Sequence, residues 1–234
     1  MTKPKAKEAK PKARTAKVAP RRSASPRGGA PAVRIRHSAI DKIALALFDI
    51  GAVKFGEFHL KSGLLSPIYI DLRLLVSHPN LLAQVAAQMA KIAKRLKFDR
   101  LAAIPYAALP IGVAVSLALD RPMIYPRKEV KDYGTGRMIE GEFLGNETIL
   151  LIDDLITKGH SKIEAIAPLV AAGLKVNDIL VLIDREQGGG QELATAGCQL
   201  HTVLTLTQLL DALVRRKKIA PEKRMEVLAW IRAN

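Results

Sequence analysis

The sequence predicts an α/β protein with a central, mostly parallel sheet flanked by helices. Strand-length apolar runs alternate with segments of helical periodicity from Leu101 onward, which is typical of βαβ units. One run, residues 149–152, is continuously apolar, as expected for a parallel strand that is buried on both faces. This run and the run at residues 178–184 both lead into charged residues, which belong at the carboxyl edge of a sheet, where α/β proteins bind ligands.

The N-terminal half of the folded part is expected to contain a helix, a pair of strands and a second helix. Residues 53–71 place apolar and aromatic residues around a Gly/Ser/Pro turn and predict paired short strands. Residues 79–98 repeat apolar residues at helical spacing and predict a long amphipathic helix. Ser38 is predicted to cap the first helix, which ends near Gly51 and has an apolar face formed by Ile40, Ile43, Ala44, Leu47 and Phe48.

The C-terminal half is expected to alternate strands with helices. Residues 127–141 are polar and contain glycine, so they predict a loop between two strands. Trp230 is expected to pack the last helix against the body. The strands are expected at residues 101–105, 123–126, 149–152, 178–184 and 201–204. The helices are expected after a turn at residues 106–110 and at residues 162–172, 205–214 and 221–234.

Composition predicts one folded domain, residues 37–234, behind a basic tail, residues 1–36. The chain has 234 residues, of which 49% are hydrophobic, and this is enough for a sizeable core. Of the net charge of +15, residues 1–36 carry +11, since six lysines and six arginines there face Glu8 alone. With almost no large apolar residue, the tail is predicted to be disordered. It serves either as an arm for nucleic acid or as a solubilising extension, and we favour the extension, without a nucleic-acid partner.

Several protein classes are excluded by composition. The longest apolar stretches have the length of strands, so neither a transmembrane span nor the apolar core of a secretory signal is expected. An organelle transit peptide would be richer in Arg, Ser and amphipathic order than the tail is, so it stays open only as a minor alternative. Cys198 is the only cysteine, which excludes an internal disulfide and a cysteine-based zinc site. A reducing compartment suits such a chain, so we expect a cytoplasmic protein without membrane contact.

The most informative stretch is residues 148–161, which read TILLIDDLITKGHS. Asp153 and Asp154 follow the buried run, and a turn through Gly159 leads into a helix. Gly159 permits close approach of the backbone, and free N–H groups at a helix start favour a phosphate. Carboxylates can accept hydrogen bonds from ribose hydroxyls, and backbone amides beside them can hold a 5-phosphate. The combination suits a sugar phosphate. The alternative is an ordinary strand, turn and helix whose two acids are merely solvated.

Three cations lie in the segment RKEVKDYG, between two expected strands. Arg127, Lys128 and Lys131 could clamp a pyrophosphate if this loop closes over it. The alternative is a charged loop that is exposed to solvent and binds nothing.

Five motifs in order resemble the orotate phosphoribosyltransferase family. Residues 148–161 resemble the phosphoribosyl-pyrophosphate signature of type I phosphoribosyltransferases. The other four are FGEFHLKSGLLSPIYIDLR, YAALP, RKEVKDYG and IDREQGG, and the whole set is most similar to the transferase half of eukaryotic bifunctional uridine monophosphate synthases. The resemblance covers about residues 40–212. It implies the type I phosphoribosyltransferase fold, in which a small N-terminal hood subdomain accompanies the sheet.

The resemblance also implies which residues contact the base and the pyrophosphate. Lys61 matches the family's substrate-contacting lysine near the reaction centre, although an exposed turn lysine would look the same. Tyr69 and Ile70 match the pair that flanks the pyrimidine ring, and the alternative for Tyr69 is a buried sheet aromatic. Tyr106 matches a pyrophosphate-binding turn. Arg185 matches the arginine that holds the orotate carboxylate, a role that its planar fork suits; its alternative is a charge that ends a strand.

The loop and the cradle complete the implied site. Arg127, Lys128 and Lys131, with Tyr133, match a mobile catalytic loop that reaches the neighbouring subunit's site, which implies a homodimer. Thr157 is also implied to lie near the orotate. The cradle for the ribose and the 5-phosphate matches Asp153, Asp154, Leu155, Ile156, Thr157, Lys158, Gly159, His160 and Ser161.

Two positions depart from the commoner bacterial pattern. Ala107 stands where that pattern has a lysine, which removes one pyrophosphate cation, and Tyr133 replaces its loop histidine. The bifunctional eukaryotic relatives share both features, so the departures indicate a subclass.

The resemblance implies a glycosyltransferase that joins orotate to phosphoribosyl pyrophosphate in pyrimidine (UMP) biosynthesis. Mg²⁺ is the expected cofactor, held mainly by the substrate and water, without a metal site in the protein. Orotidine 5-monophosphate decarboxylase, expected as a separate protein, is a candidate partner. A transferase for another base is one rival, which Arg185 disfavours. A regulator that keeps this fold and binds nucleic acid through its tail is another, which the loop cations disfavour.

Overall fold

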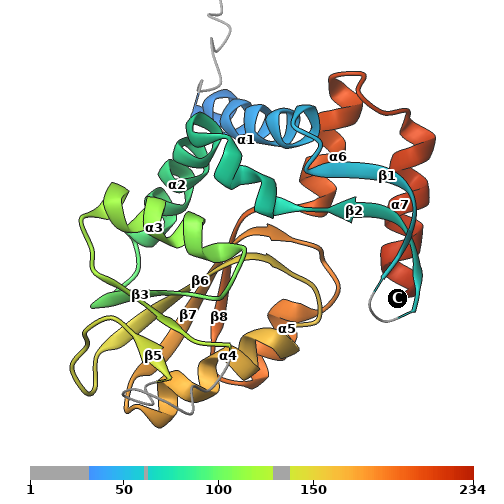
Figure 1. The fold of residues 1–234 in the computed structure, drawn as a ribbon. Helices are drawn as coiled ribbons and strands as arrows, with labels where there is room; N and C mark the ends of the chain where they lie inside the picture. The colour runs from blue at the N-terminus through green and yellow to red at the C-terminus, as the bar shows by residue number, and fades with distance from the viewer. Residues whose placement is uncertain (1–31, 61–62, 129–137) are drawn as a thin grey trace, which may run out of the picture.

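The computed structural model describes residues 32–60, 63–128 and 138–234, with side chains from residue 39 onward. It contains a six-stranded sheet in the order β5-β4-β3-β6-β7-β8, flanked by helices (Figure 1). Four neighbouring pairs, from β4 to β8, are parallel, and only β5 runs antiparallel, against β4. The predicted α/β architecture with a mostly parallel sheet is therefore confirmed. The strands are β3 Arg100–Ala103, β4 Met123–Pro126, β5 Ile139–Glu140, β6 Thr148–Ile156, β7 Lys175–Asp184 and β8 Gln199–Thr205.

Strand β6 is central and buried on both faces, as its continuous apolar run predicts. Leu150 and Ile152 belong to one core cluster and Ile149 and Leu151 to the other, because successive side chains of a strand point to opposite faces. The first cluster lies under α1, α2, α3 and α6, and the second under α4 and α5 (Figure 1). The helices are α1 Ala32–Asp49, α2 Pro79–Ala93, α3 Ala108–Leu119, α4 His160–Ala171, α5 Gly189–Thr195, α6 Leu206–Arg215 and α7 Pro221–Ala233.

An N-terminal hairpin forms the predicted hood. Strands β1 Val53–His59 and β2 Leu65–Ile70 pair antiparallel, and a bulge interrupts the pairing between Phe55 and Phe58. Figure 1 shows the hairpin apart from the large sheet, beside α7 at the upper right. Val227 and Ile231 of α7 are buried, and Trp230 packs against the same core, as expected.

Several element boundaries differ from the sequence prediction. Helix α1 begins at Ala32, so Ser38 lies inside the helix and does not cap it. The helix can extend this far towards the N-terminus because residues 32–50 contain no Pro or Gly that would interrupt it. The first residues of α1 were expected to belong to the tail, and residues 1–31 lie outside the described residues. The loop expected at residues 127–141 contains β5, and two further elements were not predicted, α5 and a 3₁₀ helix, η1, at Leu72–Ser77.

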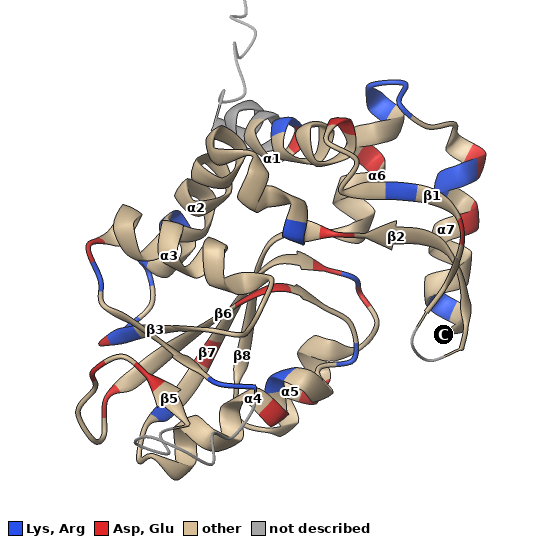
Figure 2. Ribbon diagram, in the orientation of Figure 1, with Lys and Arg blue, Asp and Glu red and all other residues tan. Residues whose placement is uncertain are grey.

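Charge is mixed over the described elements, and basic and acidic segments alternate along them (Figure 2). This fits the small net charge of +4 that remains for residues 37–234. Within the described ranges, no helix is both long and apolar enough to cross a membrane.

Candidate active site

Outside the hood, the described site residues that the sequence predicted lie in or just after the carboxyl ends of four neighbouring parallel strands. Tyr106 comes after β3, Arg127 and Lys128 after β4, Asp153 and the turn to Ser161 at the end of β6, and Arg185 after β7. The order β4-β3-β6-β7 makes these strand ends neighbours. A crevice at this edge is where open α/β sheets place their ligands.

The acidic pair is more buried than the sequence suggested. Asp153 lies within β6, pairs in register with Val181 of β7 and is only 5% exposed. Its burial is compensated by an ion pair, since Lys162 Nζ lies 2.6 Å from Asp153 Oδ2. Lys162, on the first turn of α4, is 6% exposed and also donates to Ser161 Oγ at 3.3 Å.

Asp154 has a different environment from its neighbour. Its N–H donates to Asp153 Oδ1 at 2.8 Å, and its own Oδ1 accepts from Leu155 N–H at 2.8 Å. Burial, and secondly the negative charge of Asp153, raise the pKa of Asp154 to about 7. Near neutral pH this group therefore changes between a proton donor and a charged acceptor.

The turn after β6 has the geometry of an anion cradle. Gly159 has φ +91°, which favours glycine, and stands as the N-cap of α4 without a side-chain cap. The N-terminal N–H groups of such a helix attract a phosphate. Helix α5 packs directly behind the turn, because a Cβ on Gly189 would lie 2.6 Å from Ile156 Cγ1.

The remaining cradle residues differ in exposure. Ile156 is fully buried and Leu155 is partly buried, so they support the backbone of the turn. Thr157 is partly buried, and the side chains of Lys158, His160 and Ser161 are exposed.

Arg185 is a buried cation without a partner among the described residues. It is 8% exposed, and its Nε and Nη2 atoms are buried and donate to no described acceptor. Burial lowers the pKa of its guanidinium. Its N–H donates to Ile156 O at 3.0 Å, which fixes its backbone beside the end of β6. An unpaired buried guanidinium is costly, and an anionic ligand would offset that cost.

The hood contributes a positioned aromatic ring. Tyr69 stacks on Phe58 with ring centroids 5.5 Å apart, and its Oη accepts from Arg73 Nη2 at 3.1 Å. Arg73 in turn is held by Asp71 through Nε at 2.7 Å. Ile70, the other residue expected at the base, is 9% exposed and belongs to the core.

The cations after β4 are engaged within the protein. Arg127 Nη1 lies 3.1 Å from Glu140 Oε1, and Arg127 N–H donates to Met138 O at 2.8 Å. Lys128 Nζ lies 5.1 Å from the ring centroid of Tyr106, a cation–π arrangement. Lys61, Lys131 and Tyr133, which were also assigned to the site, lie outside the described residues.

Sequence reasoning missed Lys162, Glu140, Phe58 and Arg73, which hold site residues in place. Lys162 had a detectable signal: a cation on the first turn of a helix opposes the helix dipole, so another interaction must retain it. The partners of the other three residues lie on different strands or turns, and no spacing rule identifies them.

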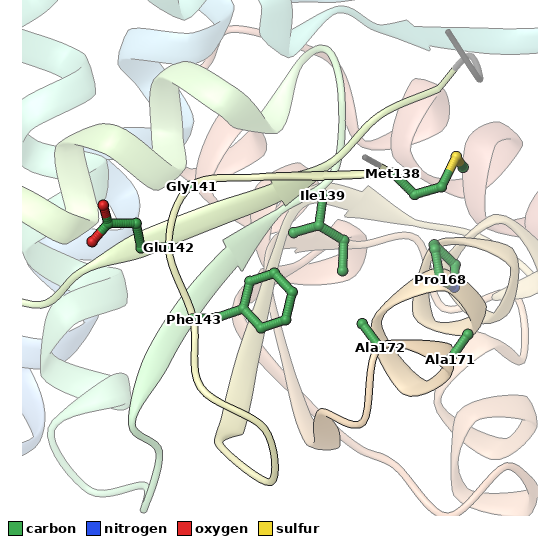
Figure 3. Close-up of a pocket in the computed structure, with 8 residues that line it drawn as sticks. All are labelled: Met138, Ile139, Gly141, Glu142, Phe143, Pro168, Ala171 and Ala172. Carbon is green, nitrogen blue, oxygen red and sulfur yellow. The ribbon is translucent and has the colours of Figure 1, made fainter. Parts of the chain in front are cut away.

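A separate apolar hollow lies beside β5. It has a volume of about 610 Å³ and lies between the segment around β5 and the C-terminal end of α4 (Figure 3). Among the residues that the structure describes, its lining contains no predicted site residue and consists of Met138, Ile139, Gly141, Glu142, Phe143, Pro168, Ala171 and Ala172.

Comparisons with known proteins identify relatives of two lengths. The chain is 43% identical over 197 residues to uridine 5'-monophosphate synthase of Bos taurus, covering 83% of this chain and 41% of that protein. It is 38% identical to orotate phosphoribosyltransferase of Caenorhabditis elegans, covering 79% of this chain and 82% of that protein. The chain therefore spans about two-fifths of the synthase but most of the shorter relative.

The solved structures that match the chain are likewise of two kinds, a longer synthase and a shorter transferase. UMP synthase of Leishmania donovani matches with a TM-score of 0.79 at 41% identity, covering 87% of this chain and 44% of that one. Orotate phosphoribosyltransferase from Aeropyrum pernix matches with a TM-score of 0.67 at 31% identity, covering 73% and 97%. No family model matches the chain.

Proposed function

The chain belongs to the orotate phosphoribosyltransferase family, and on this premise we propose that it transfers the phosphoribosyl group of phosphoribosyl pyrophosphate to orotate. The products are orotidine 5-monophosphate and pyrophosphate, in UMP biosynthesis. Arg185 carries the proposal, because its buried Nε and Nη2 atoms have no described acceptor and orotate offers a carboxylate. A neutral purine or uracil would leave this guanidinium unpaired.

In the proposed reaction a ring nitrogen of orotate attacks the anomeric carbon as pyrophosphate leaves. Positive charge then develops on the ribose and negative charge on the leaving group, and each is stabilised by opposite charge fixed in advance. The acidic pair at the end of β6 stands on the ribose side. Arg127, Lys128 and Lys131 stabilise the pyrophosphate, while Tyr69 and Arg185 hold the base in line.

Mg²⁺ is the proposed cofactor. It prefers oxygen ligands and keeps several waters, so a pyrophosphate carries it into a site without a dedicated protein cage. The candidate site fits this ion, because it offers the oxygen atoms of carboxylates and hydroxyls. The only cysteine, Cys198, is buried between β7 and α5 and offers no sulfur ligand there. When bound, the ion neutralises part of the charge on the leaving group.

The direct test mixes the protein with Mg²⁺, phosphoribosyl pyrophosphate and orotate and follows the loss of orotate absorbance. Uracil, adenine and hypoxanthine are offered in parallel. Turnover of orotate alone is expected, since Arg185 requires an anion. Turnover of another base would overturn the substrate assignment, and binding without any turnover would favour a regulator.

We also propose a homodimer in which the loop that carries Arg127, Lys128 and Lys131 completes the active site of the partner subunit. The proposed location is the cytoplasm, and the proposed functional partner is a decarboxylase. Helix α3 supports the dimer. Its sequence, ALPIGVAVSLAL, is apolar on nearly every side, and a helix of this kind is normally buried. In the single chain Val113 is 48% exposed and Leu117 is 79% exposed. A second copy that packs on this face would bury both side chains.

Subunit mixing tests the shared site. Lys131→Ala and Asp154→Asn are each expected to give nearly inactive homodimers. Random reassociation of the two should restore roughly a quarter of wild-type activity, because half of the dimers are mixed and each mixed dimer has one intact site. Leu117→Glu should abolish both the dimer, measured by light scattering, and this recovery. Mixing without recovery would mean that the loop serves its own subunit.

A further inference from the structure

The two acids of the β6 end are held in different ways. Both carboxylate oxygens of Asp153 have partners inside the protein: Oδ2 pairs with Lys162 Nζ at 2.6 Å and Oδ1 accepts from the Asp154 N–H at 2.8 Å. At 5% exposure Asp153 has little surface left for a ligand. Its carboxylate is therefore already occupied by protein groups.

Asp154 retains acceptor capacity that Asp153 lacks. In the charged form only its Oδ1 is used within the described residues, by the Leu155 N–H at 2.8 Å, whereas the protonated form also hydrogen-bonds to the Asp153 carboxyl. No described basic side chain forms an ion pair with it, and its side chain is partly exposed, whereas that of Asp153 is buried. A carboxylate with a free oxygen and some exposure can accept from a ribose hydroxyl.

Lys162 is the residue that creates this difference. Its side chain is 8% exposed, and it stands on the first turn of α4, where the helix dipole disfavours a cation. Burial of an ammonium group in such a position is retained only when a charged partner compensates it. Asp153 is that partner, so α4 and β6 are joined at the point where the anion cradle begins.

We propose that Lys162 is a positioning residue that fixes Asp153, and through the Asp153 contact to the Asp154 backbone aims Asp154 as the carboxylate that binds the ribose hydroxyls. The proposal rests on the proposed function only in taking a phosphoribosyl group as the ligand. It divides the acidic pair into a support, Asp153, and a substrate contact, Asp154.

The charged groups around Asp154 determine how the proposal can be tested by pH. Burial raises the pKa of Asp154 most, the Asp153 carboxylate on the same strand raises it further, and Lys162 on α4 lowers it by a smaller amount. The neighbouring strand β7 contributes the apolar Val181 and Ile183 at this level. Because activity requires the charged form of Asp154, kcat/KM should fall as the pH decreases below about 7.

The experiment compares four variants: Asp154→Asn, Asp153→Asn, Lys162→Met and the double variant Asp153→Asn/Lys162→Met. Asn has the shape of Asp and still accepts from a backbone N–H, and Met has the length of Lys without its charge. Each single change at the ion pair leaves one buried charge unpaired, so both should lower thermal stability and activity. The double variant removes both charges, so it should recover stability.

Three results are expected. Asp154→Asn should lower kcat/KM for phosphoribosyl pyrophosphate by about 100-fold or more without loss of thermal stability. The double variant should recover to within about tenfold of wild type, because Asp154 stays in place. The acidic limb of its pH profile of kcat/KM should also move to lower pH. The loss of the negative charge of Asp153 lowers the pKa of Asp154 by more than the loss of the positive charge of Lys162 raises it. An acidic limb that reports a group other than Asp154 would stay where it is.

A double variant as inactive as Asp154→Asn, or one with an unmoved acidic limb, would overturn the proposal. Calorimetric binding of phosphoribosyl pyrophosphate is measured for all four variants without any base. The role of Lys162 is thereby tested separately from the orotate assay, in which wild-type turnover alone decides the proposed function.

Discussion

The two sides of the candidate site differ in how far they are prepared for a ligand. At the ends of β6 and β7, Asp153 and Arg185 are at most 8% exposed, and the cradle between them is backed by α5. At the end of β4, Arg127 is paired with Glu140 at 3.1 Å, and Lys128 is exposed above the Tyr106 ring. On the proposed function, the half assigned to ribose and base is thus preformed, whereas the cations assigned to pyrophosphate must exchange internal partners to reach it.

The largest expected difference between the two sides comes from replacing their arginines by methionine. Arg185→Met removes a buried cation without a described partner, so the free energy of unfolding should rise by about 1 kcal/mol or more. The same change should raise KM for orotate by about 100-fold, because the carboxylate loses a charged, bidentate partner. Thermal unfolding and steady-state kinetics measure the two effects.

Arg127→Met is the matched control on the other side. It removes a partly exposed ion pair, so the free energy of unfolding should fall by about 0.5 kcal/mol, with KM for orotate unchanged. If Arg185→Met lowered stability as well as orotate binding, Arg185 would have a structural partner and the preformed base site would be refuted.

The preformed side was also the more predictable from the sequence. The run at residues 149–152 predicted β6, because only a strand buried on both faces needs apolar residues at every position. Gly159 predicted a turn, and the structure has a left-handed backbone at this residue. Helix α5 was missed because glycines at 188–190 disfavour a helix, yet Gly189 is needed there for close packing on Ile156.

The partners of site residues could not be predicted in the same way. The ion pair between Asp153 and Lys162 depends on how α4 folds back over β6, and that of Arg127 depends on β5, a strand of two residues. Such contacts are set by tertiary packing, and no repeating pattern of residues in a single sequence reveals them. The position of a candidate site residue could therefore be predicted where it follows a strand end, but a contact in which one side chain supports another could not.

A smaller effect is expected from adding one methyl group to the cradle. Gly159→Ala places Cβ at φ +91° and 3.3 Å from Gly189 O, so the turn should be strained by about 1 to 2 kcal/mol. KM for phosphoribosyl pyrophosphate should rise by about tenfold as the amides lose alignment. Gly173→Ala is the control, since Gly173 has φ +82° but open space around it, and should lower stability alone. Equal KM values for the two variants would show that the turn does not bind the phosphate.

The smallest expected effect is on the side that must rearrange. Glu140→Gln removes the carboxylate that holds Arg127, in a pair that is partly exposed and therefore worth about 0.5 to 1 kcal/mol. If Arg127 leaves Glu140 to bind pyrophosphate, this free energy opposes binding in the wild type. Its removal should lower the inhibition constant of pyrophosphate by roughly twofold to fivefold, and added salt should reduce the gain.

Glu142→Gln makes the same charge change in the same segment and should have no such effect, because Glu142 forms no ion pair with a described residue. Weaker pyrophosphate binding by Glu140→Gln would instead mean that Glu140 holds Arg127 in its working position, and both sides of the site would then be preformed.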